Sequence, residues 1–157
     1  MFRATIFILV MLFFQHMHNQ EHANRPALDE QLLSAIRSGD SEACRLLLIQ
    51  GANPNATIVE EGEETPLVFY VHPRSAVIYR WMLLAGLDPK TKSGDTAIVD
   101  SIAQSNMMGG NLPSDEDIII ALRLFVSAGA RLSDPNDLKA KPVVRAEYRR
   151  LYRINSP

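Results

Sequence analysis

Apolar residues recur at helical spacing in paired segments along most of this chain. The first segment has an apolar face made by Leu28, Leu32, Ala35 and Ile36. Gly39-Asp40 interrupts the spacing, and a second apolar face follows at Ala43, Leu46, Leu47 and Ile49. Gly51 then offers the left-handed backbone conformation with which many helices end. The pattern predicts a helix, a tight turn, a second helix and a glycine stop.

The same order returns in the middle of the chain. Thr65-Pro66-Leu67 is typical of a helix start, because Thr can cap and Pro lacks the N–H that the first helical position leaves unpaired. His72-Pro73 is expected to end this helix after Val71, since proline disfavours helical backbone in the residue before it. A second helix is predicted over residues 75–85, and Gly86 stops it. Its apolar side comprises Val77, Ile78, Trp81, Met82 and Leu84.

A third pair is separated by a longer connection. Thr96-Ala97-Ile98 opens its first helix, and residues 106–113 predict a loop. Ser114 is a good cap for the next helix, because acids follow it at the positive end of the helix dipole. The apolar run over residues 118–128 continues that helix, and Gly129 stops it.

Polar stretches precede the second and third pairs. Residues 57–64 predict an extended finger whose tip, Glu60 to Glu64, is acidic. Residues 91–95 predict the finger that precedes the third pair. Such acids could in principle work as catalytic pairs, but catalytic carboxylates need opposed placement around a cleft. We interpret the acidic run as a solvated loop.

The last segment, residues 134–157, predicts a C-terminal cap and tail, with a turn at 134–137 and a helix from Pro142 that packs either on the third pair or on a partner. From Pro142 onward one helical side is apolar, with Val144, Tyr148, Leu151 and Tyr152. Four arginines surround that side: Arg145, Arg149, Arg150 and Arg153. One apolar stripe and one charged face suit the terminal cap of a repeat stack. We interpret the arginines as a solvated face; an acidic partner or a phosphate is the alternative.

The middle pair carries a family signature. Thr65-Pro66-Leu67 and Leu83–Pro89 match the T-P-L start and the L-L-x-x-G-A-D-x-N end of ankyrin repeats, with the spacing of that family. The first copy matches through Leu46–Asn55, and the third through Gly94–Ile98 and Leu124–Ala130. The chain therefore resembles the ankyrin-repeat family.

The resemblance implies an all-α fold, an ankyrin-repeat solenoid of three helix-turn-helix repeats with short hairpin fingers and a C-terminal capping helix. The repeats would cover residues 28–56, 60–90 and 91–133, with the cap and tail over 134–157. The chain departs from the family pattern in three places. The first copy lacks T-P-L, Val68 stands where the family has His, and an insertion at 105–113 interrupts the third copy.

The N-terminus has a different pattern. Arg3 precedes an apolar run, Ala4–Phe14, which is shorter than the roughly twenty residues of a membrane-spanning helix. A positive start, a short apolar core and a polar tail predict a signal peptide over residues 1–23. The mature protein would then be periplasmic or secreted and free of the membrane. The alternatives are a partly buried helix or a membrane anchor formed by residues 4–14.

The net charge, the single cysteine and the absence of known catalytic motifs argue against several classes of function. The net charge of −2 over 157 residues gives no electrostatic case for nucleic acid. The single cysteine, Cys44, lies in an apolar run and is expected to be a buried structural thiol. No nucleophile elbow, zinc-protease helix, C-x-x-C or phosphate loop occurs. We therefore expect no enzyme activity, no cofactor and no metal, and treat His16 and His18 as an accidental pair.

By resemblance, the finger tips and inner helices would bind a protein. The matching positions are Arg37, Glu61, Glu63, Glu64, Tyr70, His72, Lys92, Asp95 and Gln104. The acidic finger would favour a basic surface on the partner, and we expect the protein to be a monomer. Two alternatives stay open: a periplasmic immunity protein that neutralises a secreted toxin such as a phospholipase effector, and a membrane-tethered scaffold. A hydrolase would need a cleft that no motif marks.

Overall fold

The computed structural model describes residues 26–72, 75–90, 96–105 and 113–155. The predicted signal peptide and the predicted finger at 91–95 lie outside the described residues. The described part is mostly helical, as expected, with one antiparallel pair of strands. Its elements are helical residues 26–38, α2 (Ser41–Ile49), β1 (Thr57–Glu60), β2 (Glu63–Pro66), the 3-10 helix η1 (Leu67–Tyr70), α3 (Ala76–Leu84), α4 (Ala97–Gln104), α5 (Asp115–Ser127) and α6 (Pro142–Asn155).

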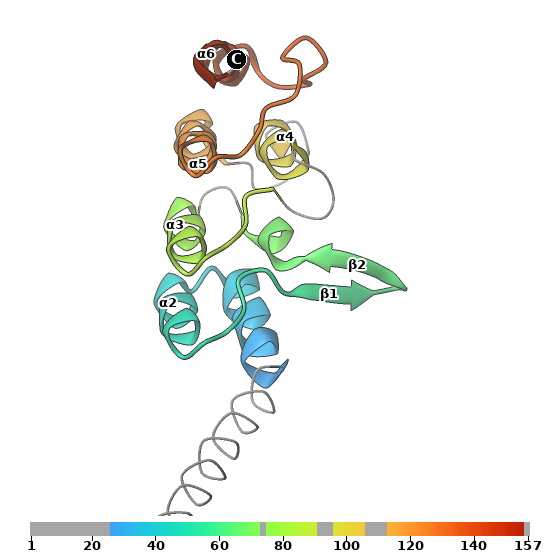
Figure 1. The fold of residues 1–157 in the computed structure, drawn as a ribbon, viewed down its shortest axis with the longest axis vertical. Helices are drawn as coiled ribbons and strands as arrows, with labels where there is room; N and C mark the ends of the chain where they lie inside the picture. Colours follow the sequence, from blue (N-terminus) through green and yellow to red (C-terminus); the bar gives the residue numbers. More distant parts are fainter. Residues whose placement is uncertain (1–25, 73–74, 91–95, 106–112, 156–157) are drawn as a thin grey trace, which may run out of the picture.

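The helices stack in two rows (Figure 1). The outer row consists of α2, α3, α5 and α6, each in contact with the next. The inner row consists of helical residues 26–38, η1 and α4. The β1–β2 hairpin projects sideways from the inner row, away from the outer one. No helix in the described ranges is long and apolar enough to cross a membrane.

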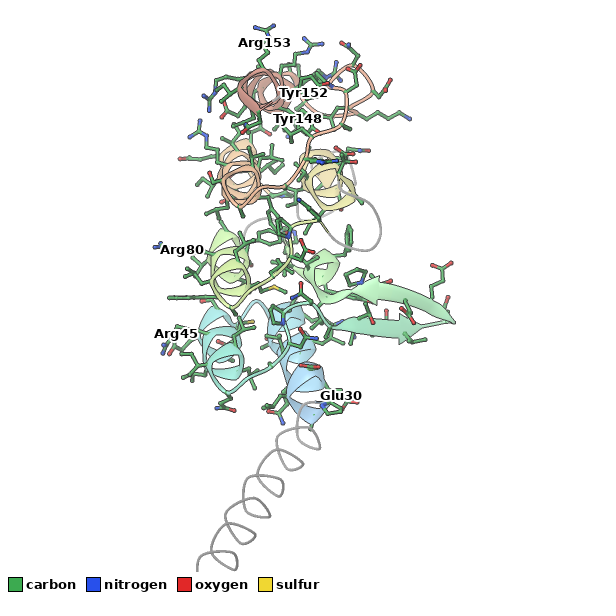
Figure 2. The ribbon with its side chains drawn as sticks, in the orientation of Figure 1. Glu30, Arg45, Arg80, Tyr148, Tyr152 and Arg153 are labelled. Carbon is green, nitrogen blue, oxygen red and sulfur yellow. The ribbon has the colours of Figure 1, made fainter. Side chains whose placement is uncertain are left out.

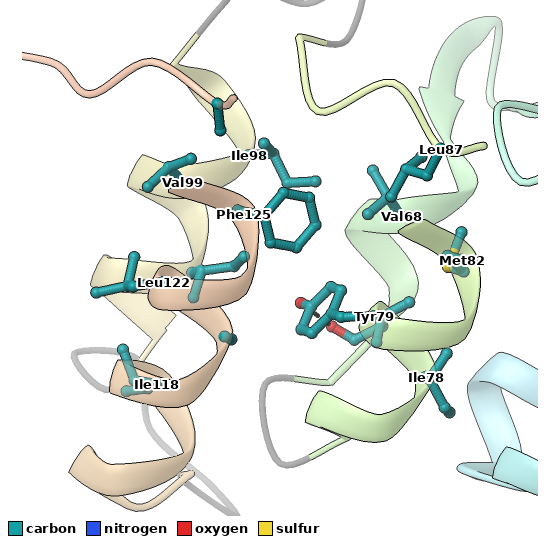
Figure 3. Close-up of a cluster of buried hydrophobic side chains, with 14 of the residues drawn as sticks. Val68, Ile78, Tyr79, Met82, Leu87, Ile98, Val99, Ile118, Leu122 and Phe125 are labelled. Carbon is teal, nitrogen blue, oxygen red and sulfur yellow. Dashed lines mark hydrogen bonds between the residues drawn. The ribbon is translucent and has the colours of Figure 1, made fainter. Parts of the chain in front are cut away.

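The core fills the space between the rows and between successive layers. The ring of Tyr79 on α3 meets that of Phe125 on α5 edge to face, with centroids 5.2 Å apart (Figure 3). The Tyr79 hydroxyl donates to the carbonyl of Val71 at 2.8 Å, so this buried polar atom is satisfied. Ile98 on α4 and Leu122 on α5 belong to the same cluster of buried side chains.

A glycine turn recurs at the helix ends. Gly86 has a φ of 93°, and its N–H donates to the carbonyl of Leu83 while the next N–H, of Leu87, donates to Met82 at 2.9 Å. This is the Schellman arrangement, in which a left-handed residue satisfies the last helical carbonyls. The same hydrogen-bond pattern follows the helix ends before Gly39, Gly51 and Gly129. The three predicted glycine stops are confirmed.

Asn55 joins one such turn to the next. Its side-chain nitrogen donates to the carbonyl of Gly86 at 2.9 Å, and its side-chain oxygen accepts from the N–H of Asp88 at 2.7 Å. One amide group thus binds the backbone of the following turn at both of its polar atoms. It therefore helps to set how α3 stacks on α2.

The predicted helix start at Thr65 is wrong. Thr65 lies in β2, paired with Ile58, and Pro66 gives η1 no side-chain cap. The backbone N–H of Leu67 donates to the carbonyl of Ala56 at 2.9 Å, so the hairpin bonds continue past Pro66. They leave room only for one 3-10 turn before the backbone becomes extended at Val71. The extended finger predicted over 57–64 is confirmed.

The predicted buried faces of α2 and α3 are partly wrong. Ile49 and Leu84 are each 69% exposed, while Cys44 and Tyr79 are buried. Leu46 on α2 and Val77 on α3 are also exposed, and on α2 it is Leu48 that is buried. Consecutive residues in these helices are apolar, so helical spacing alone does not select the buried side. Trp81 is half-buried and packs against the core. The Arg45 guanidinium lies 5.9 Å from the centroid of the Trp81 ring. Figure 2 shows Arg45 and Arg80 on the outer row.

The predicted C-terminal helix is confirmed, and of its two possible positions the structure shows packing on the last layer. Ser114 caps α5 through a reciprocal capping box with Asp117. On α6, Val144, Tyr148 and Leu151 are buried against α5 and α4. The arginines Arg149, Arg150 and Arg153 are exposed and Arg145 is half-buried.

Candidate partner-binding surface

The acidic hairpin owes its shape to a tight turn. Glu61 and Gly62 have φ values of 54° and 88°, and Glu60 pairs with Glu63 across the turn. Two central residues with positive φ form the type I′ turn, whose twist matches that of the flanking strands. Glycine adopts this conformation without steric cost, whereas Glu61 is an uncommon residue there. The turn reverses the chain at the outer end of the hairpin.

Three side chains from separate elements hold the hairpin at the strand pair next to its turn. The Arg37 guanidinium forms an ion pair with the Glu60 carboxylate. The Tyr70 hydroxyl donates to the other oxygen of that carboxylate at 2.9 Å, and Arg37 lies over the Tyr70 ring, 4.8 Å from its centroid. Helical residues 26–38, β1 and η1 are thereby joined. We call this the base cluster.

The base cluster changes the proton affinity of its members. Arg37, and next the Tyr70 hydroxyl, lower the pKa of the Glu60 carboxyl. The pair raises the pKa of Arg37. Both charged side chains are about half exposed, at 48% each. Water screens such a pair, so its main effect is to orient the hairpin rather than to stabilise the whole fold.

The other three glutamates of the hairpin carry free negative charge. Glu61, Glu63 and Glu64, which we call the acidic tip, are exposed. None of the three makes a side-chain hydrogen bond or an ion pair with the described residues. Carboxylates held together at one projecting end can attract lysine or arginine side chains and speed their approach.

A pocket of about 210 Å³ lies between η1 and α4, next to the hairpin. Its described apolar lining includes Val68, Phe69, Val71, Tyr79, Ile98 and Ile102. Its polar lining consists of Tyr70, His72, Ser101 and Ser105. His72 and Ser101 are exposed, so the pocket opens to solvent on the inner row. We call it the inner pocket.

The structure brings most of the predicted binding residues to one side of the molecule. Arg37 and Tyr70 meet in the base cluster, and Tyr70 and His72 also line the inner pocket. Gln104 is half-buried at the last position of α4. Lys92 and Asp95 lie outside the described residues.

Sequence reasoning missed two features of this surface. In the sequence Glu60 is one of four acids in the run 60–64, although Arg37 and Tyr70 make it part of the base cluster. Ser101 and Phe69 were not considered, although they line the inner pocket. No local pattern links Arg37 to Glu60 across 23 residues. The signal in the sequence was that Arg37 and Tyr70 both occupy positions that the family resemblance predicts to bind a partner.

A second polar cluster lies in the last layer and has a packing role. Asp100 on α4 accepts hydrogen bonds from the hydroxyls of Tyr148 and Ser133, at 2.7 and 2.8 Å. The Tyr148 oxygen accepts from the backbone N–H of Ser133 at 2.9 Å. Tyr148 is fully buried, and its burial raises the pKa of the hydroxyl. The cluster ties α6 to α4 and offers no open position for a substrate.

Metal chemistry has no prepared site in the part of the chain that the structure describes. No group of three His, Cys, Asp or Glu residues there could hold an ion. Cys44 is fully buried, and desolvation raises the pKa of its thiol to about 11, so it is a poor nucleophile or metal ligand.

No protein-family model matches the chain. No curated protein matches it either. The case for a function therefore rests on the residues and geometry of the molecule itself.

Proposed function

We propose that the protein is a non-enzymatic binding module of the ankyrin-repeat type that holds another protein against its hairpin and inner row. One observation carries this proposal. The base cluster holds a projecting hairpin in a defined direction, and the acidic tip at its end has three carboxylates without partners among the described residues. Fixed, unpaired charge at the edge of a stack suits recognition of a basic protein surface better than it suits packing within the chain.

Repeated local structure supports the ankyrin-type assignment. Paired elements follow one another, each outer helix before the last ends in the same glycine turn, and the hairpin precedes η1 at the place of a finger. The three repeats would span residues 28–56, 60–90 and 91–133, with 134–157 as the cap. The middle unit departs from the pattern, because η1 is a single 3-10 turn instead of an inner α-helix.

Export is part of the same proposal. The apolar run Ala4–Phe14 after Arg3 would direct secretion, and its removal near Asn24 would leave a monomeric periplasmic or secreted protein. N-terminal sequencing of the protein recovered from an expressing cell tests this step. A retained Met1 on membrane-bound protein would instead support an anchor formed by residues 4–14.

Binding is tested by copurification followed by reconstitution. The full chain is used to capture a partner from its native source, and the complex is rebuilt from the two purified proteins to measure Kd. Glu61→Lys/Glu64→Lys should weaken that complex at least tenfold and reduce the dependence of association rate on salt. This variant leaves Glu60 and its cross-strand neighbour Glu63 in place.

The matched control is Glu116→Lys/Asp137→Lys, which makes the same change in net charge at exposed positions on α5 and in the loop before α6. It should bind as the original chain does. Equal losses in both double variants would show that only net charge matters. No loss in either would remove the acidic tip from the binding surface.

A further inference from the structure

We infer that the inner pocket receives one large apolar side chain from a partner segment whose neighbouring residues are basic and meet the acidic tip. The inference rests on the proposed function and adds the chemistry of the bound segment. It describes a two-part ligand, in which an uncharged anchor enters the pocket and lysines or arginines lie along the hairpin.

The size of the inner pocket favours a single side chain. Its volume of about 210 Å³ is below the roughly 300–1,000 Å³ of small-molecule sites. Its floor is apolar, because Val68, Ile98 and Ile102 are each no more than 2% exposed. Interfaces gain most of their affinity where such an anchor fills a pocket of this kind.

The lining excludes a charged anchor. None of the described residues that line the pocket is Asp, Glu, Lys or Arg. A charged side chain placed there would lose its hydration without gaining an ionic partner, which is costly. At the rim, the Ser105 hydroxyl already donates to the carbonyl of Ile102 at 2.7 Å. Leucine, phenylalanine and tryptophan therefore fit the pocket better than lysine or glutamate.

Tyr70 connects the pocket to the hairpin. Its side chain lines the pocket, and its hydroxyl binds Glu60, the last residue of β1. The pocket and the acidic tip are thereby held at a defined separation. A segment that places its anchor in the pocket would also pass the hairpin. The glutamates of the acidic tip are complementary to positive charge on that segment.

The test uses a random peptide library displayed on phage and selected against the full chain. Selected peptides should combine basic residues with one Leu, Phe or Trp. They are then synthesised, and Kd is measured by calorimetry. Replacing the apolar residue of a peptide by Ser, or its basic residues by Gln, should each weaken binding roughly tenfold or more, which is about 1.4 kcal/mol.

Variants of the protein locate the two parts of the ligand. Ser101→Trp should obstruct the pocket from an exposed position of α4 and weaken peptide binding roughly tenfold, a typical cost of losing an anchor. Ser101→Ala should leave the pocket open and the Kd of the peptides unchanged. Ser127→Trp, at an exposed position of α5 in the outer row, is the matched control and should also leave Kd unchanged. Circular dichroism checks that each variant is folded.

The outcomes separate this inference from the proposed function. Peptides that lose affinity with Glu61→Lys/Glu64→Lys but not with Ser101→Trp would overturn the pocket anchor and leave the acidic tip as a binding surface. Peptides whose Kd changes with neither protein variant would contradict both the pocket anchor and the acidic tip as a binding surface. Selection of no peptide, or of peptides without an apolar residue, would overturn the two-part ligand, while the reconstituted complex still decides the proposed function.

Discussion

Arg37 and Glu60 lie 23 residues apart and form an ion pair that ties the acidic hairpin to helical residues 26–38. The Tyr70 hydroxyl binds the same carboxylate from η1. The pair is half exposed, so its importance lies in where it places the hairpin. A binding surface on a two-stranded hairpin needs such support, because an isolated hairpin is at best marginally stable in water.

Removal of the ion pair should loosen the hairpin without unfolding the protein. In Arg37→Ala, amide hydrogen exchange over residues 57–66 should become faster, because local opening no longer breaks the bond to Glu60. The midpoint of urea unfolding should change little. Arg80→Ala, at an exposed arginine of the outer row, is the control. Equal amide hydrogen-exchange rates over residues 57–66 in the two variants would show that Arg37 does not hold the hairpin.

Glu147 should make stability depend on pH in the acidic range. Arg150, and then Arg123, lower the pKa of its carboxyl to about 2, from the 4.5 of an unperturbed glutamate. The unfolded chain therefore binds the proton first as the pH falls. The contribution of Glu147 is fully present above about pH 4.5 and is lost between there and pH 2.

Urea unfolding of the original chain and of Glu147→Gln at pH 7 and pH 3 measures this contribution. The difference in unfolding free energy between the two proteins should be larger at pH 7 than at pH 3. A difference that does not change with pH would show that the two arginines do not bind the ionised carboxylate in solution.

The Tyr148 hydroxyl should stabilise the packing of α6. Tyr148→Phe removes the donor to Asp100 and the acceptor for the Ser133 N–H. Leaving buried polar groups unpaired costs about 1–3 kcal/mol, so the free energy of unfolding should fall by that amount. Tyr152→Phe, on the same helix but half exposed, should have a much smaller effect. Similar losses in the two variants would contradict a specific role for the cluster.

Two neighbouring positions on α3 should respond very differently to truncation. Met82 is fully buried and Leu84 is 69% exposed. Met82→Ala should cost about 2–5 kcal/mol through lost contacts and a cavity, whereas Leu84→Ala should stay within about 0.5 kcal/mol. Thermal or urea unfolding of both variants tests the arrangement. Similar losses in the two variants would place Leu84 on the buried side of α3 together with Met82, as helical spacing first suggested.

Cys44 should be unreactive in the folded protein. Its side chain is fully buried, and burial raises the pKa of the thiol to about 11. At pH 8 a thiol reagent such as DTNB should react only as fast as the protein opens, and rapidly in concentrated urea. Fast stoichiometric reaction without denaturant would show that α2 does not pack as described.

The sequence by itself determined the local elements. Glycine after an apolar helix predicts the left-handed turn at Gly86, because only a residue without a β-carbon adopts it at no cost. Ser114 followed by acids predicts the start of α5, and the polar run over 57–64 predicts the hairpin. These features depend on residues only a few positions away in the sequence, so they can be recognised before the tertiary structure is known.

Only the tertiary structure decided which sides of the helices are buried and which charges meet. Apolar residues are consecutive in α2, so neighbouring layers had to select Leu48 over Ile49. Thr65 became a strand residue because pairing with Ile58 outweighed its tendency to cap a helix. The base cluster likewise joins Arg37 to Glu60 through stacking. Local patterns do not specify such contacts, since their free energy arises only when distant segments are brought together.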